Sequence, residues 1–451
     1  MNKLPLIGTF LFLILFSPYV KSQSTKTDLK PISSEMKELL MKNMMKSWYP
    51  RVIDDKFGGY FSNFDYKWSM LDEQPKMIVT QSRHIWTCSK MATFTGDKKY
   101  LVYAEHGYKF LRDIMWDKIN GGFYNLVTRE GVPIAERTNV GINKNAYGNA
   151  FAIYGLSAYY KESGNADALE LAKKTFYWLE EHSHDAIYGG YFQSINNDGT
   201  PVKDNLNSIP PKDQNSSIHI MEAFTELYQV WPDELVRERL NEMFLLIRDV
   251  IISKKGSLQL YMTKDLTPIS YQDSSKEVHQ KNFYLDHMSF GHDTETSFLL
   301  KETSEVLNLA NDPKTLEISK KMVDNALING WDKENGGVYD AGYVYKNENK
   351  PTILLDTKNW WAQAETLHAL LIMSQLYPDD PMEYEKKFVK QWQFIKENLI
   401  DWKYGGWYSA AIDKEPDAKN ALKSQIWKGN YHTTRAIINC ITRIKNADMA
   451  N

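Results

Sequence analysis

Apolar residues recur at helical spacing in twelve segments of the chain, and these segments fall into six pairs. Polar turn clusters such as "TGDKKY" (95–100) and "WPDE" (231–234) join one pair to the next. The predicted helices, in chain order, span 33–49, 77–95, 98–115, 143–163, 165–182, 214–231, 233–252, 291–309, 312–330, 358–376, 381–399 and 425–445.

A short glycine motif lies inside each pair, between its two helices. It reads "DDKFGGYF", "WDKINGGFY", "HDAIYGGYF", "WDKENGGVY" and "DWKYGGWY", with first glycines at 58, 121, 189, 336 and 405. The spacings are 63, 68, 147 and 69 residues, and "KKGSLQLY" (254–261) is a degraded copy within the long gap. Because glycine accepts positive φ and the flanking aromatic residues favour strands, each motif predicts a tight hairpin. The chain therefore consists of six units of about 70 residues.

Six helical hairpins without a linker between them predict an all-α, closed (α/α)6 toroid, with the second helix of each pair on the inside. We expect one catalytic domain over residues 33–445. An open helical solenoid is the alternative, because it would produce the same repetition.

The N-terminus has the pattern of a secretory leader, with Lys3, an apolar core over 4–16 and a small-residue exit near Ser22. We therefore expect residues 1–22 to be a signal peptide and the mature protein to be exported, in the periplasm and not in the membrane. The net charge of −3 gives no basic field for nucleic acid. The two cysteines, Cys88 and Cys440, are expected to be buried free thiols, with a disulfide as the alternative.

In a closed toroid the N-terminal ends of the inner helices face one cavity. Three of the ten histidines lie at such ends in separate units. Two of them occur as His-x-x-Glu, which places the carboxylate on the same helix face as the imidazole. The residues at these ends are Arg83, Tyr147, Asn149, His219, Glu222, His292, Glu295, Trp360, Trp361, Glu365, His432 and Arg435.

Each of these residues also has a purely structural interpretation. His219 could be a hydrogen-bonded core histidine, and Trp361 could be packing. Arg83 and Arg435 could pair with helix carboxylates for stability alone. His292 could open a helix, although Asp293 is the better capping residue. The recurrence across units favours a functional interpretation.

The residue types also narrow the chemistry. Repeated His-x-x-Glu can bind iron or zinc on facing helices, but no cysteine joins the set, so we expect no metal. No strained G-x-S-x-G turn supplies a nucleophile, and no glycine-rich phosphate loop implies a nucleotide cofactor. Histidines that face each other across a pocket suit proton transfer near neutral pH, as in inversion of a carbon beside a carbonyl.

Several motifs together resemble the N-acylglucosamine 2-epimerase superfamily, and within it the cellobiose 2-epimerase (mannobiose 2-epimerase) branch. They are "QSRHIW", "HIMEAFTELYQVWPD", "DHMSFGHDTETSFLL", "KNWWAQAETL" and "WKGNYHTTRA", and the resemblance covers about residues 35–445. It implies an (α/α)6 barrel that epimerises the reducing-end sugar of β-1,4-linked disaccharides at C2 without a cofactor.

The resemblance also implies roles for individual residues. His292 and His432 would be the two acid/base residues, and His219 would hold the opened sugar together with Arg83. Glu295 would orient a histidine, and the residues contacting the sugar would be Tyr147, Trp361, Glu365 and Trp427. The chain departs from the branch pattern at Ser217, at Asn430 and at Phe298, and the last of these bears on disaccharide preference.

Three other functions remain open from the sequence. A monosaccharide epimerase or aldose–ketose isomerase would use the same histidines. A glycoside hydrolase would need two carboxylates, for which Glu222, Glu295 and Glu365 are the candidates. A glycan-binding protein would not need three cavity histidines. The natural sugar and the oligomeric state do not follow from the sequence.

Overall fold

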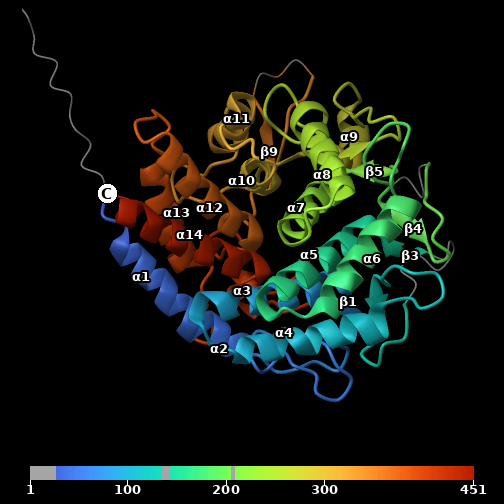
Figure 1. The fold of residues 1–451 in the computed structure, drawn as a ribbon. Coiled ribbons are helices and arrows are strands. Elements are labelled where there is room, and N and C mark those ends of the chain that lie inside the picture. Colours follow the sequence, from blue (N-terminus) through green and yellow to red (C-terminus); the bar gives the residue numbers. More distant parts are fainter. Residues whose placement is uncertain (1–26, 135–141, 205–208, 347, 349, 451) are drawn as a thin grey trace, which may run out of the picture.

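The computed structural model describes residues 27–134, 142–204, 209–346, 348 and 350–450. Within this part of the chain, helices alternate between an inner and an outer ring (Figure 1). The expected leader, residues 1–22, lies outside the described residues. The described helices include none that is long and apolar enough to cross a membrane.

The six inner helices are those that the repeat predicted. Their bounds are α3 (Ile78–Thr95), α5 (Ala146–Ser163), α7 (Gln214–Val230), α10 (Phe290–Val306), α12 (Trp360–Leu376) and α14 (Tyr431–Ala450). Thirteen or more residues of each of α3, α5, α7 and α12 are buried, and the buried residues include polar ones such as Gln81, Arg83 and His219. The largest error is in α14, which begins six residues later than predicted.

The outer ring holds the first helix of each pair. Its members are α1 (Lys30–Leu39), α4 (Lys99–Phe110), α6 (Ala166–His182), α8 (Glu234–Leu246), α11 (Pro313–Asn329) and α13 (Tyr384–Asn398). Three of them continue into a wider helical turn, at Leu40–Met45 followed by α2 (Lys46–Trp48), at Leu111–Met115 and at Ile247–Ile251. A further short helix, α9 (Lys276–Asn282), belongs to the long loop that precedes α10.

The inner ring closes on itself. Each inner helix packs against the next, in the order α3, α5, α7, α10, α12 and α14, and α14 packs back against α3. Helix α14 also packs against α1, where Lys30 and Asp448 lie 3.7 Å apart. The fold is therefore a closed (α/α)6 barrel and not an open solenoid.

All six predicted hairpins are present. An antiparallel bridge flanks each glycine motif, as between Ile53 and Tyr60, and the degraded fourth copy has the same bridge between Ile252 and Leu258. Both glycines of the five complete motifs have positive φ. At Gly122, a side chain would also meet the Trp178 ring at 2.6 Å, so the hairpin can press against the neighbouring outer helix only with glycine there.

A buried lysine locks five of the hairpins to the following inner helix. The lysine lies two residues before the helix or in the loop leading to it, and its ammonium group binds the first aspartate of the hairpin. The pairs are Lys76–Asp54, Lys144–Asp117, Lys212–Asp185, Lys358–Asp332 and Lys423–Asp401. In the fourth unit the corresponding positions are Met288 and Ser253, so both charges are missing together.

Short antiparallel strands fix where the inner helices begin. The pairs are β1 (Lys76–Met77) with β2 (Leu126–Val127), β3 (Ile142–Asn145) with β4 (Ser194–Asn196), β5 (Lys212–Asp213) with β6 (Tyr261–Met262), and β7 (Met288–Ser289) with β8 (Ala341–Tyr343), which also pairs with β9 (Thr352–Leu355). Each pair joins the entry of one inner helix to the segment after the next hairpin. The strands thus form a belt around the mouth of the barrel.

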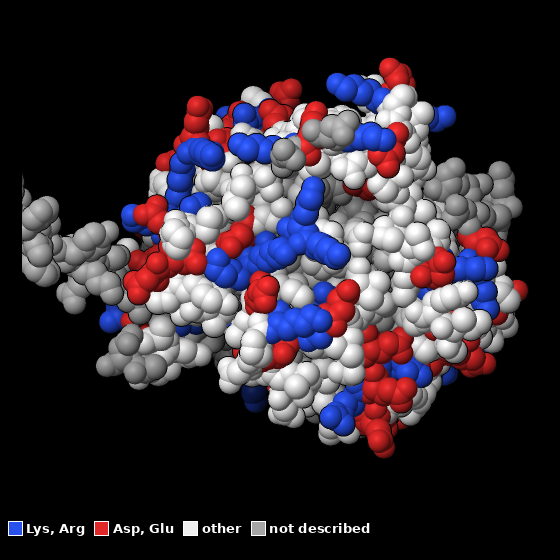
Figure 2. Space-filling view, turned by 90° about the horizontal axis from the view of Figure 1, so that it is seen from above, with Lys and Arg blue, Asp and Glu red and all other residues white. Residues whose placement is uncertain are grey.

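The surface and the cysteines agree with the composition. Figure 2 shows the side of the barrel near α11, where basic side chains gather around the centre and acidic ones lie among and beside them. Neither basic nor acidic side chains cover this face as a whole.

Cys88 and Cys440 are both buried and free, as predicted.

Candidate active site

A cavity of about 180 Å³ lies at the N-terminal ends of the inner helices. All six inner helices or the loops that enter them contribute to its wall. The lining residues are Arg83, Tyr147, Asn215, His219, His292, Glu295, Trp360, Trp361, Trp427 and His432. Of the nine residues predicted for the site, eight line this cavity, and Glu365 lies directly behind His432.

His219 is oriented by the carboxylate of Glu222, three positions later on the same helix face. Its Nδ1 lies 2.7 Å from Glu222 Oε2, as the His-x-x-Glu spacing predicts. The ring packs edge-on against Tyr147, whose hydroxyl accepts a hydrogen bond of 3.0 Å from Arg83. The Arg83 guanidinium is held over the Phe151 ring at 4.3 Å. Arg83, Tyr147 and His219 therefore form one rigid wall of hydrogen-bond donors.

His432 is oriented by a carboxylate from the neighbouring inner helix. Its Nδ1 lies 2.6 Å from Glu365 Oε1, and both side chains are buried. Burial lowers the pKa of His432 well below its usual value, so the ring is neutral at physiological pH. Burial also raises the pKa of Glu365 to about 7, against the opposing charge of Arg435. The pair can therefore gain or lose one proton near neutrality.

His292 is oriented by a hydroxyl group. Its Nδ1 lies 2.7 Å from Ser289 Oγ, three residues earlier. Burial lowers the pKa of His292 to about 4, so this ring is also neutral. His292 makes no hydrogen bond to the Glu295 carboxylate, whose Oε1 accepts one from Arg435 and lies 3.9 Å from His432 Nδ1.

Asp293 does not cap α10, contrary to the sequence interpretation. Its side chain turns away from the cavity and accepts a hydrogen bond of 2.8 Å from the Leu258 backbone in the fourth hairpin. In two other units a glutamine takes this position, Gln81 at Tyr60 and Gln363 at Val338, and each bonds both backbone groups. Burial raises the pKa of Asp293 well above its usual value, which favours a neutral acid group that mimics the amide.

Arg435 joins three glutamates beneath the histidines. Its guanidinium contacts Glu222 Oε1, Glu295 Oε1 and, at 2.7 Å, Glu365 Oε1. Burial alone would raise the pKa of Glu222, but the charge of Arg435 and the hydrogen bond from His219 bring it down to about 2. Arg435 thus fixes the carboxylates that in turn fix His219 and His432, through the pairing with helix carboxylates that the sequence analysis gave as one possibility.

Glu295, Glu365 and His432 each bring one potential ligand atom within 4.8 Å of the others. The arginine already lies among these groups, because its Nη2 contacts Oε1 of both carboxylates. A guanidinium ion provides the positive charge that the two carboxylates require. We therefore assign the cluster to binding Arg435.

Tryptophan rings form the remaining walls. The Trp361 ring lies near both acid/base candidates, 4.6 Å from the centre of the His292 ring and 5.9 Å from the centre of the His432 ring. Trp427 is 46% exposed at the mouth and faces Tyr147 across it. Phe298 is buried below the cavity, against His368 and Arg435, so it offers no stacking surface to a sugar in the cavity.

Two cavity features were missed from the sequence. Asn215, the second residue of α7, lines the cavity. Ser289 orients His292 through a hydrogen bond. A polar residue in the first helical turn and a serine three positions before a histidine are signals that are too common to stand out. Ser217, noted as a departure from the family pattern, donates to the Asp213 carbonyl and does not line the cavity.

Comparison with known protein families gives one match that covers most of the chain. The model for "N-acylglucosamine 2-epimerase (GlcNAc 2-epimerase)" matches residues 59–436. This range includes every residue that lines the cavity.

Individual relatives agree with the family model. A cellobiose 2-epimerase from Dictyoglomus turgidum is 28% identical over 423 residues, covering 92% of this chain and 100% of the relative. A D-mannose isomerase from Marinomonas mediterranea is 26% identical over 405 residues, covering 88% and 94% of the two chains. The structure of a cellobiose 2-epimerase from Spirochaeta thermophila superposes with a TM-score of 0.80 at 28% identity, covering 94% of this chain and all of that one.

Proposed function

The chain belongs to the N-acylglucosamine 2-epimerase family and is a carbohydrate isomerase, and on that premise we propose that it inverts C2 of the reducing-end sugar of β-1,4-linked disaccharides. The substrate would be cellobiose-like or mannobiose-like, and the product would exchange a glucose for a mannose residue. The observation that carries this proposal is the pair of neutral histidines, His292 and His432, that line one cavity and both lie beside Trp361.

Inversion at C2 needs a base on one face of the carbon and an acid on the other. Because the reaction is reversible, each histidine must act as the base from one epimer and as the acid from the other. A histidine that can present either a lone pair or an N–H to the cavity meets this requirement.

The His432–Glu365 pair can do so through one proton. When Glu365 is ionised, it accepts the Nδ1–H of His432, and Nε2 is left as a base. When Glu365 is protonated, its O–H donates to Nδ1, and Nε2 carries the proton as an acid. Since the pKa of Glu365 lies at about 7, both states are populated at neutral pH.

Ser289 allows His292 to present either a lone pair or an N–H group at Nε2, and it does so without a charged partner. A hydroxyl group can donate a hydrogen bond to Nδ1 or accept one from it. His292 can therefore present either Nε2 state to the cavity, and its neutrality avoids placing a second buried charge near Arg435.

The remaining wall would hold the reacting oxygens. Removal of the C2 proton from the open-chain sugar places negative charge on O1 and O2 of an enediolate. Arg83, Tyr147 and His219 offer N–H and O–H donors on one side of the cavity, where they would stabilise that charge. Trp361 and Trp427 supply flat apolar faces for the sugar rings.

A glycoside hydrolase mechanism fits the geometry less well. It requires a carboxylic acid and a carboxylate that face the scissile bond. The candidates Glu222, Glu295 and Glu365 all contact Arg435, and two of them also bind a histidine. An aldose–ketose isomerase would use the same histidines and differs only in returning the proton to C1.

The deciding experiment is incubation of the purified protein with cellobiose, and separately with mannobiose, in D₂O, followed by NMR. Deuterium at C2 together with exchange of glucose for mannose at the reducing end is the expected result. Deuterium at C1 with a ketose product would replace epimerisation by aldose–ketose isomerisation. Cleavage of the glycosidic bond would overturn the proposal.

We also propose that the mature protein is exported to the periplasm as one catalytic domain. The support is the leader pattern over residues 1–22 and the unbroken helical repeat that follows it. Fractionation of cells that express the full chain, with N-terminal sequencing of the product, tests this. A cytoplasmic protein that retains residues 1–22 would contradict it.

A further inference from the structure

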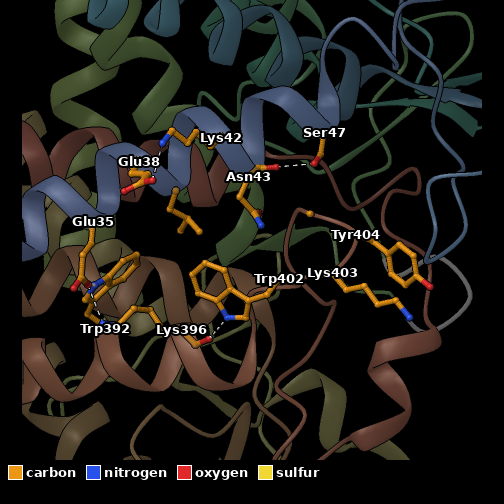
Figure 3. Close-up of a pocket in the computed structure, with 12 residues that line it drawn as sticks. Glu35, Glu38, Lys42, Asn43, Ser47, Trp392, Lys396, Trp402, Lys403 and Tyr404 are labelled. Carbon is orange, nitrogen blue, oxygen red and sulfur yellow. Dashed lines mark hydrogen bonds and ion pairs between the residues drawn. The ribbon is translucent and has the colours of Figure 1, made fainter.

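A second cavity, of about 580 Å³, lies on the outside of the barrel, where the sixth unit meets the first (Figure 3). It is about three times larger than the central cavity. Helix α1 and the turn after it form one side, α13 forms the other, and the sixth hairpin closes one end. Its lining residues are Glu35, Glu38, Leu39, Lys42, Asn43, Ser47, Trp392, Lys396, Trp402, Lys403, Tyr404 and Gly405.

Trp402 is the central residue of this groove. This residue is 66% exposed, although tryptophan is highly buried on average in folded proteins. The indole N–H donates to the Lys396 carbonyl at 2.9 Å, which holds the ring between the two helices. The ring is thus fixed in place with a large part of its surface open.

The other hairpins show that the fold does not need an aromatic residue there. Trp402 directly follows the first aspartate of its hairpin. At the same position the other complete hairpins carry Asp55, Lys118, Ala186 and Lys333. The buried lysine–aspartate pair and the two glycines are common to all five. The exposed indole is therefore an addition to this one hairpin.

The polar groups around Trp402 nearly balance in charge. Glu35 and Glu38 face Lys42, Lys396 and Lys403. Glu35 is held by the indole N–H of Trp392 at 3.0 Å and by Lys396 at 2.8 Å, and its carboxylate side chain is still half exposed. Such a mixture of donors and acceptors gives no strong preference for an anion or a cation. It suits a neutral ligand that has many hydroxyl groups and an apolar face.

We propose that this groove is a second, non-catalytic binding site for a neutral oligosaccharide, with one sugar ring stacked on Trp402. A pyranose has axial C–H groups on one face and hydroxyl groups around its edge, which match the indole face and the surrounding Glu38, Lys42 and Lys403. A cavity of this volume is within the range of ligand sites, about 300–1,000 Å³. The site would keep a long glycan on the protein while the central cavity acts on a chain end.

The inference rests on the proposed function only for the class of sugar, so cellotetraose and mannotetraose are the probes. Isothermal titration of the full chain is expected to show two binding events. In Trp402→Ala one event weakens at least tenfold, since truncation of a central aromatic contact commonly costs that much. Trp427→Ala weakens the other event, at the central cavity.

Ile187→Ala is the matched control, because Ile187 is an 82% exposed apolar residue at the tip of the third hairpin. It is expected to leave both events unchanged. If the central cavity binds no sugar but Trp402→Ala still removes an event, the proposed function fails and the second site stands. If Trp402→Ala binds as the unaltered chain does, or changes only self-association in sedimentation, the second site is overturned.

Discussion

The two histidines that line the central cavity beside Trp361 are held differently, although both are neutral. His432, in the sixth unit, rests on Glu365 and through it on Arg435. His292, in the fourth unit, rests on the Ser289 hydroxyl, and among the described residues no carboxylate hydrogen-bonds to it. The same unit has lost the buried lysine–aspartate pair, with Met288 and Ser253 in its place. Charged groups therefore control the protonation of His432, whereas an uncharged hydroxyl group controls that of His292.

The difference follows from what a buried charge costs. Two histidines near Arg435 that both relied on ionised carboxylates would require more compensating charge in one small volume. The fourth unit avoids this requirement with a hydroxyl group and a neutral Asp293. Its neutral hairpin shows that the lysine–aspartate pair is optional only when both partners leave together.

The largest expected effect is on turnover. His292→Ala and His432→Ala should each lower the rate of C2 exchange by about 10²–10⁴-fold, because each removes one of the two proton-transfer groups. The measurement is deuterium incorporation at C2 by NMR. The circular dichroism spectrum and the thermal midpoint serve as the folding control, and a near-normal rate in either variant would show that the two-histidine assignment is wrong.

The second prediction concerns the neutral hairpin. Lys212→Met should lower the free energy of unfolding by about 3–5 kcal/mol, because it leaves the Asp185 carboxylate buried without its partner. The double variant Lys212→Met with Asp185→Ser copies the fourth unit and should recover most of that loss. Urea denaturation measures both.

Additive losses in the double variant would contradict the view that the two charges depend on each other. Lys42→Met is a suitable control, because its ion pair with Glu38 is exposed and contributes little.

A smaller effect is expected at the serine that orients His292. Ser289→Ala should lower kcat about tenfold, through loss of one hydrogen bond worth about 1.4 kcal/mol in orientation of the ring, with little change in KM. Ser289→Thr keeps the hydroxyl group and should retain most of the rate. If Ser289→Ala lowers only the thermal midpoint, the hydroxyl has a structural role alone.

The smallest expected change is in the pH profile. The folded-state pKa of His292 lies at about 4, below the ordinary value near 6.5, so the ring stays neutral until the pH falls toward 4. In the direction in which His292 is the base and His432, with Glu365 protonated, is the acid, the acid limb of kcat/KM should therefore lie below pH 5. Because the folded-state pKa of His292 is depressed, the contribution of this one group to stability should fall as the pH falls from about 6.5 to 4.

Ser289→Asp replaces the neutral partner of His292 by a carboxylate, as His432 has in Glu365. A carboxylate beside His292 favours the charged ring, so the acid limb should move to higher pH. An unchanged limb would show that a group other than His292 controls it.

The sequence predicted those features of the fold and of the site that follow from the six-unit repeat. Helical periodicity and the glycine motif predicted all twelve barrel helices, and a closed ring then placed Arg83, His219 and His432 at one mouth. The partners of these residues were harder to predict. Arg435 contacts Glu222, 213 positions away, and such a contact leaves no local pattern in one sequence.

Local spacing also misled in one place. His219 and His292 share the His-x-x-Glu pattern, but only His219 hydrogen-bonds to its glutamate. Glu222 binds His219 and Arg435 through different oxygens, whereas Glu295 binds Arg435 and not His292. Asp293 looked like a capping residue because aspartate usually has that role at a helix start. Its actual role required knowledge of the hairpin packed beside it.

The contact between α1 and α14 has a consequence for the order of the units. Since Lys30 and Asp448 are neighbours, a short linker could join the two ends of the described chain, and new ends could be opened in an exposed turn such as 163–165. A ring of six like units has no structural first member. The fold itself therefore does not determine which unit comes first in the chain, and a circularly permuted chain should still assemble the same cavity.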